Sequence, residues 1–395
     1  MTAVRHNDVK KEEKEQEKEQ AQCIGSVLGA HNSPEGRRVA ASVEKLIDGE
    51  KMLDKLVASR KNCTIESTAG YAAELHHKVT FEADAIFKGK QDMLVELGPR
   101  GGFGSKGTAD LVVNKGNKKV AEAGLKYRAK ATETTFDQSN CFDQGRQKIC
   151  PSDQVERVKQ LASDRAKTGT LKAPEYSDTA RNATDRLKHD GVESKPLSKK
   201  GAEELVTKGG KYSDDALKLE MKTNTANAAI AGAALGAATS TVSNVVDCWN
   251  GEKSVADAGK QVIKDTVKSG ARSAAVSAMT TGTKHALIKA GAQNVAKGNV
   301  PMAIASTIFE AGGDIYGDIR KCCNGEVTQS EVAVNAVKHT SKAAAKTGGA
   351  MAGAEVGAMI GAVGGPIGAA AGGIIGGTVG YLASCELVSV ISDWF

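Results

Sequence analysis

The first half of the chain takes its fold from residues 109–127, which read ADLVVNKGNKKVAEAGLKY. Two β-forming runs flank the polar segment NKGNKK, and this arrangement predicts two strands joined by a tight turn. In a strand, every second side chain lies on the same face of the sheet. Glu122, Gly124 and Lys126 are therefore expected to share one face.

Whether Asp110 joins that face depends on the length of the turn. A turn of odd length, such as a three-residue loop at 115–117, sets Asp110 opposite Glu122. A two-residue turn at 116–117 instead puts Asp110 on the other face, away from Lys126. The register of this hairpin thus decides whether the charged side chains meet.

The elements around the hairpin complete a small α/β domain. Apolar residues recur every three or four positions over 37–59, which predicts a helix interrupted near Gly49. A second helix is expected over 66–88 and a third over 153–166. Three strands are expected between them, at Met93–Leu97, Ala109–Val113 and Val120–Tyr127. We therefore expect an α+β protein in which a small α/β domain precedes an Ala/Gly-rich α-helical repeat domain.

Glu82 is a further candidate, singled out by the helical pattern. Steps of 100° per residue along the helix over 66–88 place Glu82 inside the apolar stripe. A buried carboxylate needs a cation beside it. From the sequence, that cation is either a metal ion or one of the many lysines.

The charged residues of the hairpin form a chemically useful set if they converge. Asp and Glu carboxylates can hold Mg²⁺ or Mn²⁺, and a neighbouring lysine can orient a water molecule or stabilise charge on a phosphate. Phosphodiester hydrolysis needs this combination. The catalytic candidates are Asp110, Glu122 and Lys126, and the metal-binding candidates are Asp110, Glu122 and Glu82.

At these residues, the chain resembles the PD-(D/E)xK, or restriction-endonuclease-like, nuclease superfamily. In that family, a helix carries an acidic residue, the following strands carry Asp and then (Glu/Asp/Gln)-x-Lys, and a helix packs behind them. The resemblance covers at most residues 66–166. It implies that Asp110 binds the metal, that Lys126 is the motif lysine, and that Glu82 or Glu74 is the acid on the helix.

The sequence departs from this pattern at Gly124, two residues before Lys126, where the family has a carboxylate or a glutamine. The metal site is complete only if Glu122 reaches it from two residues further back. The same stretch is similar to bacterial mobile-element proteins with an A-D-L-V, L-K and P-S-D-Q series. That series is matched by Ala109–Val112, Leu125-Lys126 and Pro151–Gln154.

Basic residues are concentrated in this part of the chain. Residues 100–130 hold eight Lys and Arg against two acidic residues, although the whole chain carries only +6. Nucleic-acid phosphates attract such a segment. The nucleic-acid-binding candidates are Arg100, Lys106, Lys118, Lys119, Arg128 and Lys130. The Gly-rich segment 98–107 lacks both P-loop spacing and a following helix, so we expect a flexible turn there.

The composition changes at about residue 226 to Ala, Gly, Val and Ile, and the sequence then repeats at an offset of 74 residues. Ala229-Ile230-Ala231 matches Ala303-Ile304-Ala305, and Asn250-Gly251-Glu252 matches Asn324-Gly325-Glu326. We therefore expect two copies of one helical hairpin, each with an N-G-E turn between its helices. Such units bury their apolar faces by stacking.

A glycine ladder lies near the end of the chain, in a stretch of 30 residues without a charge. It consists of Gly357, Gly361, Gly365, Gly368, Gly372, Gly376 and Gly380. On a helix, this spacing lets a second backbone approach closely. We expect a helix seam, which either contacts a membrane over 355–386 or lies inside a compact bundle, soluble or self-associating. Similar glycine-zipper segments occur in bacterial toxins, effectors and phage proteins.

The expected organisation has five parts: a charged tail (1–22), N-terminal helices (23–64), the nuclease-like domain (65–175), a linker or peripheral helices (176–225) and the repeated hairpins (226–395). The charged N-terminus has no apolar signal-peptide core, and no C-x-x-C pair occurs, so a cytoplasmic start is expected rather than Sec secretion.

Two functions are compatible with these features. In the first, the chain is a bacterial or phage effector or toxin that acts on nucleic acid, with Mg²⁺ or Mn²⁺ if it is an active nuclease. Its helical half then associates with a membrane or self-assembles. In the second, the chain is not an enzyme: the helical half perturbs a membrane or assembles, and the α/β domain is only a binding module.

Overall fold

The computed structural model describes most of the chain between residues 19 and 350. The described residues are 19–21, 23–31, 33–98, 107–209, 212–249, 253–289, 300–323, 326–328, 331, 335, 338–340, 342–350, 352, 380, 381 and 384. The fold is α+β, mostly helical with a small mixed five-stranded sheet. The chain divides into an α/β unit, 38–216, and a helical unit formed by 1–37 together with 217–395.

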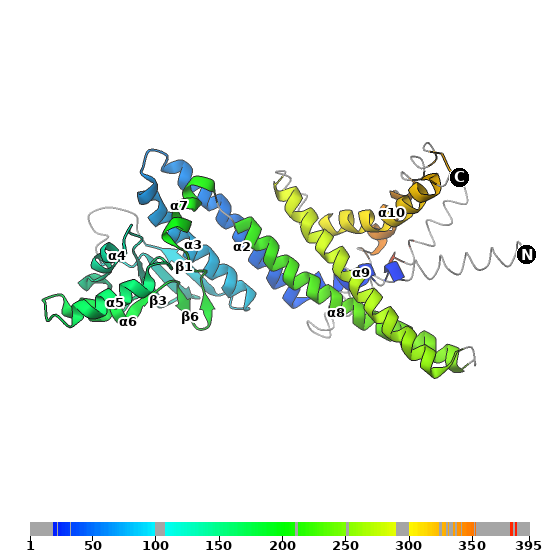
Figure 1. Ribbon diagram of the computed structural model, residues 1–395, viewed down its shortest axis with the longest axis horizontal. Helices are drawn as coiled ribbons and strands as arrows, with labels where there is room; N and C mark the ends of the chain where they lie inside the picture. Colours follow the sequence, from blue (N-terminus) through cyan, green and yellow to red (C-terminus); the bar gives the residue numbers. More distant parts are fainter. Residues whose placement is uncertain are drawn as a thin grey trace, which may run out of the picture. The chain divides into compact units, whose positions relative to one another are not determined.

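Two helices open the α/β unit, α2 (Pro34–Ser59) and α3 (Ile65–Phe87) (Figure 1). The Thr64 side chain caps α3 by accepting a hydrogen bond from the Ser67 amide at 3.2 Å. The predicted interruption at Gly49 is wrong, because α2 continues through it. A Cβ at Gly49 would lie 2.8 Å from Cγ2 of Val79. This glycine therefore permits a close approach to α3 rather than ending α2.

The sheet has the strand order β1-β2-β3-β4-β5. Its strands are β1 (Met93–Leu97), β2 (Leu111–Lys115), β3 (Lys118–Leu125), β4 (Gln147–Ile149) and β5 (Ala183–Thr184). The first three are antiparallel, whereas β3, β4 and β5 are parallel. The prediction of three strands from 93 to 127 is confirmed, with the second and third displaced by two residues.

Helices make the crossover connections that parallel strands require. The β3–β4 connection contains α4 (Ala131–Gln138) and the short 3₁₀-helix η1 (Cys141–Asp143). The β4–β5 connection contains α5 (Val155–Ala166), close to its predicted range, and α6 (Ala173–Asn182). Helix α5 packs on β5 and helix α6 on β4, and α4 packs against both of these helices.

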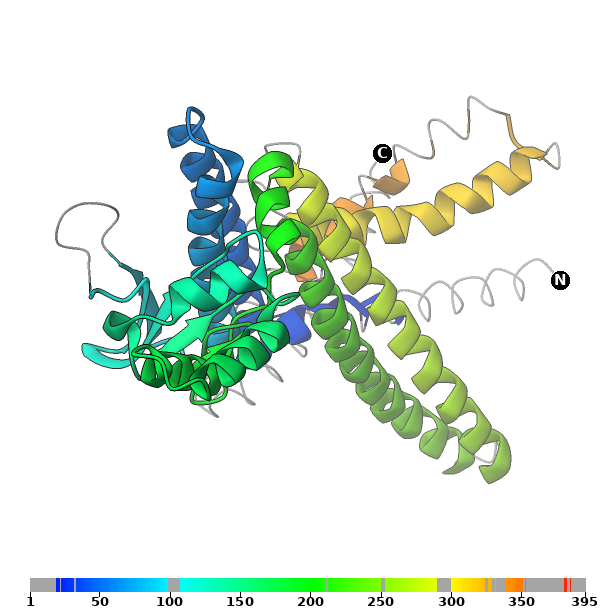
Figure 2. The same ribbon diagram turned by 60° about the vertical axis from the view of Figure 1, so that its left-hand side comes forward.

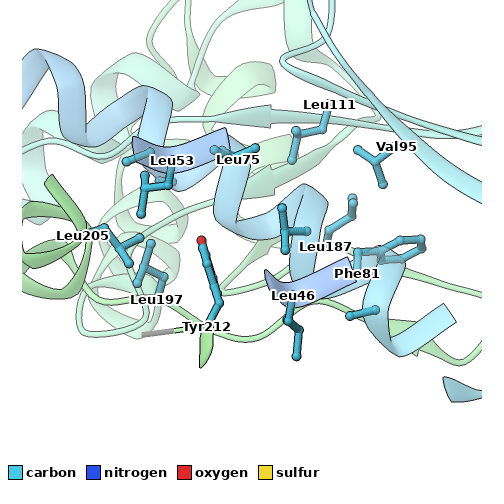
Figure 3. Packing of buried hydrophobic residues seen from close by; sticks show 14 of the residues in the cluster. Leu46, Leu53, Leu75, Phe81, Val95, Leu111, Leu187, Leu197, Leu205 and Tyr212 are labelled. Atoms are coloured by element: carbon cyan, nitrogen blue, oxygen red, sulfur yellow. The ribbon is translucent and has the colours of Figure 1, made fainter. Parts of the chain in front are cut away.

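The main core of the α/β unit lies between α3 and one face of the sheet. Val95 and Leu111 project from the strands into the same cluster as Leu75 and Phe81 of α3 (Figure 3). Burial alternates along β1 and β2, so the other side chains of these strands lie on the opposite face. That opposite face carries Asp110 and Glu122.

The segment predicted as a linker or peripheral helices, 176–225, is largely part of the α/β unit. It contributes β5, the hairpin of β6 (Lys188–His189) and β7 (Val192–Glu193), and α7 (Lys199–Lys208). Leu187, Leu197, Leu205 and Tyr212 from this segment join the main core (Figure 3). The sequence did not indicate this role, because the segment is mostly polar and only a few apolar residues join the core.

The helical unit contains α8 (Tyr212–Trp249) from residue 217 onward, α9 (Val255–Lys289) and α10 (Val300–Cys323). Helices α8 and α9 lie side by side in both views (Figures 1 and 2), and the first N-G-E segment falls between them. Ion pairs and hydrogen bonds fix their antiparallel register, with Lys284 Nζ 2.9 Å from Glu220 Oε1 and Ser240 Oγ 2.6 Å from Asp265 Oδ2.

The second repeat uses the same positions for a polar contact. Asp265 and Asn244 both bond to Ser240 in the first copy. The residues 74 positions later, His339 and Asp318, lie 3.0 Å apart. The two copies therefore pair their helices in equivalent registers.

The helical residues 19–21 and 23–31 also belong to the helical unit. Those that are buried pack with Val276, Met302 and Tyr381. Glu19 binds Lys268, with its Oε1 2.7 Å from the ammonium, and also pairs with Arg272. The division between the two units falls after residue 37, inside the range 23–64 that is expected as one set of N-terminal helices.

Candidate functional site

A bulge, rather than the turn, brings Asp110 to the face of Lys126. The turn is the two-residue type, with Gly116 at φ +58°, and Lys115 pairs with Lys118. The register then shifts next to Val113, which pairs with Ala121. The extra residue of a bulge restores the alternation that a two-residue turn would have reversed. The prediction that such a turn abolishes the site is therefore wrong.

Asp110 and Lys126 form an ion pair beside adjacent strand ends. Asp110 Oδ2 lies 3.2 Å from Lys126 Nζ and accepts a hydrogen bond of 2.6 Å from the amide of Leu125, the last residue of β3. Both charged side chains are 29% exposed. The pair is thus held by the backbone of β3 and is still reachable by a ligand.

Glu122 lies on the same face, two residues further into the sheet from Gly124. Its carboxylate contacts Lys119 at 2.9 Å and Arg146 at 3.3 Å. Lys119 above all, with Arg146, holds the pKa of Glu122 below its usual range. Glu122 also lines a cavity of about 480 Å³ over the face of β1–β3, together with Glu96, Val112 and Arg146.

Asp143 occupies the space that a side chain at Gly124 would need. A Cβ at Gly124 would lie 3.0 Å from Cγ of Asp143. The Asn140 side chain holds Asp143 in place, because its Oδ1 accepts from the Asp143 amide at 3.0 Å and its Nδ2 donates to Asp143 Oδ2 at 2.9 Å. Sequence reasoning missed Asp143 and Arg146. The one indication in the sequence was Gly124, because a residue without a side chain leaves space that another segment, here the one with Asp143, can fill.

Glu82 is held on the open edge of β1 and not with Asp110. Its carboxylate accepts a hydrogen bond from the Val95 amide at 2.8 Å and pairs with Lys45 at 2.5 Å and Lys78 at 2.8 Å. Lys78 also donates to the Val95 carbonyl. Pairing with lysine, which the sequence left open, is the arrangement observed, and it satisfies the backbone of an edge strand.

Glu74, the other candidate for the acid on the helix, lies nearer to Lys126. The two residues line one cavity of about 420 Å³, together with Ser67, Gly70 and Arg128. The cavity lies between the first turns of α3 and the end of β3. Of the two candidate glutamates, Glu82 and Glu74, it is therefore Glu74 that shares a cavity with Lys126.

The histidines of α3 have a structural role. His77 Nδ1 is 2.8 Å from Ser194 Oγ, and its Nε2 is 3.0 Å from Tyr127 Oη. His76 Nε2 lies 3.0 Å from the Lys195 carbonyl oxygen. Burial lowers the pKa of His76 to about 4 and that of His77 well below its usual value. Both imidazoles thus join α3 to the segment before α7 in their neutral form.

The basic candidates are divided between the two ends of β3. Lys118 and Lys119 begin the strand, whereas Arg128 and Lys130 follow its end. Eight residues of strand separate these groups by roughly 25 Å. Arg128 is paired with Asp137 at 2.5 Å. Arg100 and Lys106 lie outside the described residues.

Most of the glycine ladder, from Gly357 to Gly376, also lies outside the described residues. Gly380 is described, and its carbonyl oxygen lies 2.7 Å from where a Cβ of Gly349 would be. A similar close approach occurs between α8 and α9, where a Cβ at Gly232 would lie 2.8 Å from the Ser269 carbonyl oxygen. None of the helices in the described part of the chain is both long enough and apolar enough to cross a membrane.

The described carboxylates do not fit a divalent ion as they are arranged. Asp110 is bound to Lys126 and a backbone amide, Arg146 joins Glu122 to Asp143, and Glu82 is held at β1. Over the described residues, no three His, Cys, Asp or Glu side chains come together as a metal site. Comparison with known proteins finds no matching family model, curated protein or solved structure.

Proposed function

We propose that the α/β unit is a nucleic-acid-binding domain of the PD-(D/E)xK nuclease type. The observation that carries this proposal is the ion pair of Asp110 and Lys126, 3.2 Å apart on one face of the sheet. The order of elements also agrees with the resemblance: α3, then three antiparallel strands, with Asp110 directly before the second and Lys126 directly after the third, and then helix α4.

Phosphate is the chemical group that this surface would recognise. Lys126 is partly exposed beside the cavity that Glu74 also lines, and Lys118 and Lys119 are exposed at the other end of β3. Contacts spaced by roughly 25 Å along one strand suit an extended polyanion better than a small phosphate ester. Lysine ammonium groups bind such a backbone without reading its sequence.

The test is binding of a labelled duplex and a labelled single strand to the full chain at 50 and 200 mM salt. Because phosphate contacts release counterions, affinity should fall at least tenfold over this range. Exchange of Lys118 and Lys119 for Ala should weaken binding and make its salt dependence shallower. The same exchange of Lys55 and Lys200, which are exposed outside this segment, is the matched control. Absence of binding at low salt would refute the proposal.

The helical unit supports a second proposal, that it works through close helix packing. The approach of Gly349 to the Gly380 carbonyl favours a seam that includes the end of the ladder. On this proposal, the chain is an effector-like protein of a bacterium or phage. Its helical unit assembles or associates with a membrane over 355–386, and its α/β unit engages nucleic acid.

A further inference from the structure

Arg146 is a fixed cation among the carboxylates of the candidate site. It lies between η1 and β4, and its guanidinium binds three partners from three segments. Nε is 3.3 Å from Glu122 Oε2, Nη1 is 3.0 Å from Asp143 Oδ1, and Nη2 donates to the Gly107 carbonyl at 2.8 Å. Its side chain is only 15% exposed. The guanidinium therefore has little freedom to leave this position.

The position of Asp143 excludes a carboxylate at residue 124. A Cβ at Gly124 would lie 3.0 Å from Cγ and 3.1 Å from Oδ2 of Asp143. Any longer side chain there would have to displace Asp143 and, with it, the Arg146 contact. The carboxylate that lies over Gly124 is thus that of Asp143, which comes from η1 and is already paired with Arg146.

Three carboxylates on this face are paired with cations without any added ion, and the exposed Glu96 lies on the same face. Three carboxylates, those of Asp110, Glu122 and Asp143, face three cations, Lys126, Lys119 and Arg146, with each carboxylate within 3.3 Å of a cation. A divalent ion binds where oxygen ligands leave a net negative charge. Placed beside Glu122 and Asp143, it would meet the guanidinium of Arg146 and be repelled by it.

We propose that Arg146 takes the place of a divalent ion in this domain, so that the face carrying Asp110 and Lys126 engages phosphate without metal and does not cleave it. The part concerning phosphate rests on the proposed function, whereas the part concerning metal does not. Loss of the arginine charge would free Glu122 and Asp143 together and leave the face with an excess of negative charge. Arg146→Gln is therefore expected to create a divalent-ion site.

The first experiment measures Mn²⁺ binding to the full chain by electron paramagnetic resonance, without nucleic acid. Arg146→Gln should bind Mn²⁺ at least tenfold more tightly than the wild type, and Arg146→Gln with Asp143→Asn should lose this gain. Arg157→Gln removes the same charge from an exposed position on α5 and should bind as the wild type does. Wild-type binding as tight as that of Arg146→Gln would overturn the proposal.

The second experiment needs only the wild type, so it does not depend on the folding of a variant. Duplex binding at low salt should be the same within twofold in EDTA and in 5 mM Mg²⁺, and the duplex should remain uncut with Mg²⁺ or Mn²⁺. A tenfold loss of binding in EDTA, or cleavage that disappears in Asp110→Ala, would overturn the proposal. Absence of any duplex binding would refute the proposed function and leave the Mn²⁺ measurement to decide the role of Arg146.

Discussion

Replacement of Glu82 by Gln should destabilise the α/β unit, because this carboxylate holds α3 to the edge of β1. The substitution keeps the shape and an acceptor for the Val95 amide but removes the charge that pairs with Lys45 and Lys78. Removal of one partner from a buried ion pair costs about 3–5 kcal/mol. Lys45 and Lys78 are 29% and 18% exposed and regain some hydration, so we expect a loss of about 3 kcal/mol.

For a unit of this size, about 3 kcal/mol corresponds to a lower Tm by roughly 6–12 °C. Scanning calorimetry of the full chain measures this change, and hydrogen exchange of the peptide that contains Met93–Leu97 localises it to β1. Glu44→Gln, an exposed position on α2, is the matched control and should change Tm by about a degree or less. If Glu82 were instead a metal ligand, its removal would relieve repulsion between carboxylates. An unchanged or higher Tm for Glu82→Gln would therefore refute the structural role.

Three further outcomes are expected. Burial lowers the pKa of His76 from 6.5 to about 4. Between these pH values, only the unfolded chain takes up a proton at this residue. The free energy of unfolding should therefore fall by about 3 kcal/mol as the pH drops from 6.5 to 4. Urea titrations should show a weaker pH dependence for His76→Asn, and an unchanged dependence would contradict this assignment. Gly232→Ala should destabilise the helical unit by about 2 kcal/mol, because its Cβ would lie 2.7 Å from Cβ of Ser273. Gly282→Ala, with nothing within 4 Å, should stabilise it by up to about 1 kcal/mol in the same thermal melts, and equal effects would argue against a close helix crossing. Replacement of both Gly372 and Gly376 by Leu should impair folding or assembly if the ladder is a seam, whereas liposome flotation at or above the wild-type level, with assembly intact, would favour simple hydrophobic insertion.

Local patterns in the sequence predicted the strands of the hairpin and most helices of the α/β unit. A short β-forming run placed β1 at Met93–Leu97, and the helix expected over 66–88 agrees with α3 within one residue at each end. The apolar pattern of this helix marked Glu82 as buried. These features depend on neighbouring residues, so a single sequence carries enough information to find them.

Features that depend on distant parts of the chain were not predictable in the same way. No local sequence pattern indicates the bulge after Lys119, yet this bulge decides on which face of the sheet Asp110 lies. Asp143 and Arg146 reach the face from a polar loop that gave no periodic signal. Gly49 suggested a helix end because its packing partner, Val79, is thirty residues away and unknown to a local pattern. Strand β5 has two residues, too few for any alternation.

The helical unit is discontinuous in the sequence, since its first helix precedes the α/β unit and the rest follows it. During synthesis, the apolar helical residues 23–31 leave the ribosome roughly 190 residues before the helical unit resumes at residue 217 and the helices that cover them begin to emerge. At ordinary elongation rates, this delay lasts about ten to forty seconds. The α/β unit has all its residues by 216 and can fold first, while the exposed helix is a target for chaperones or for other nascent chains. Translation that stops near residue 216 would therefore release a folded α/β unit joined to an uncovered apolar helix, a product expected to aggregate.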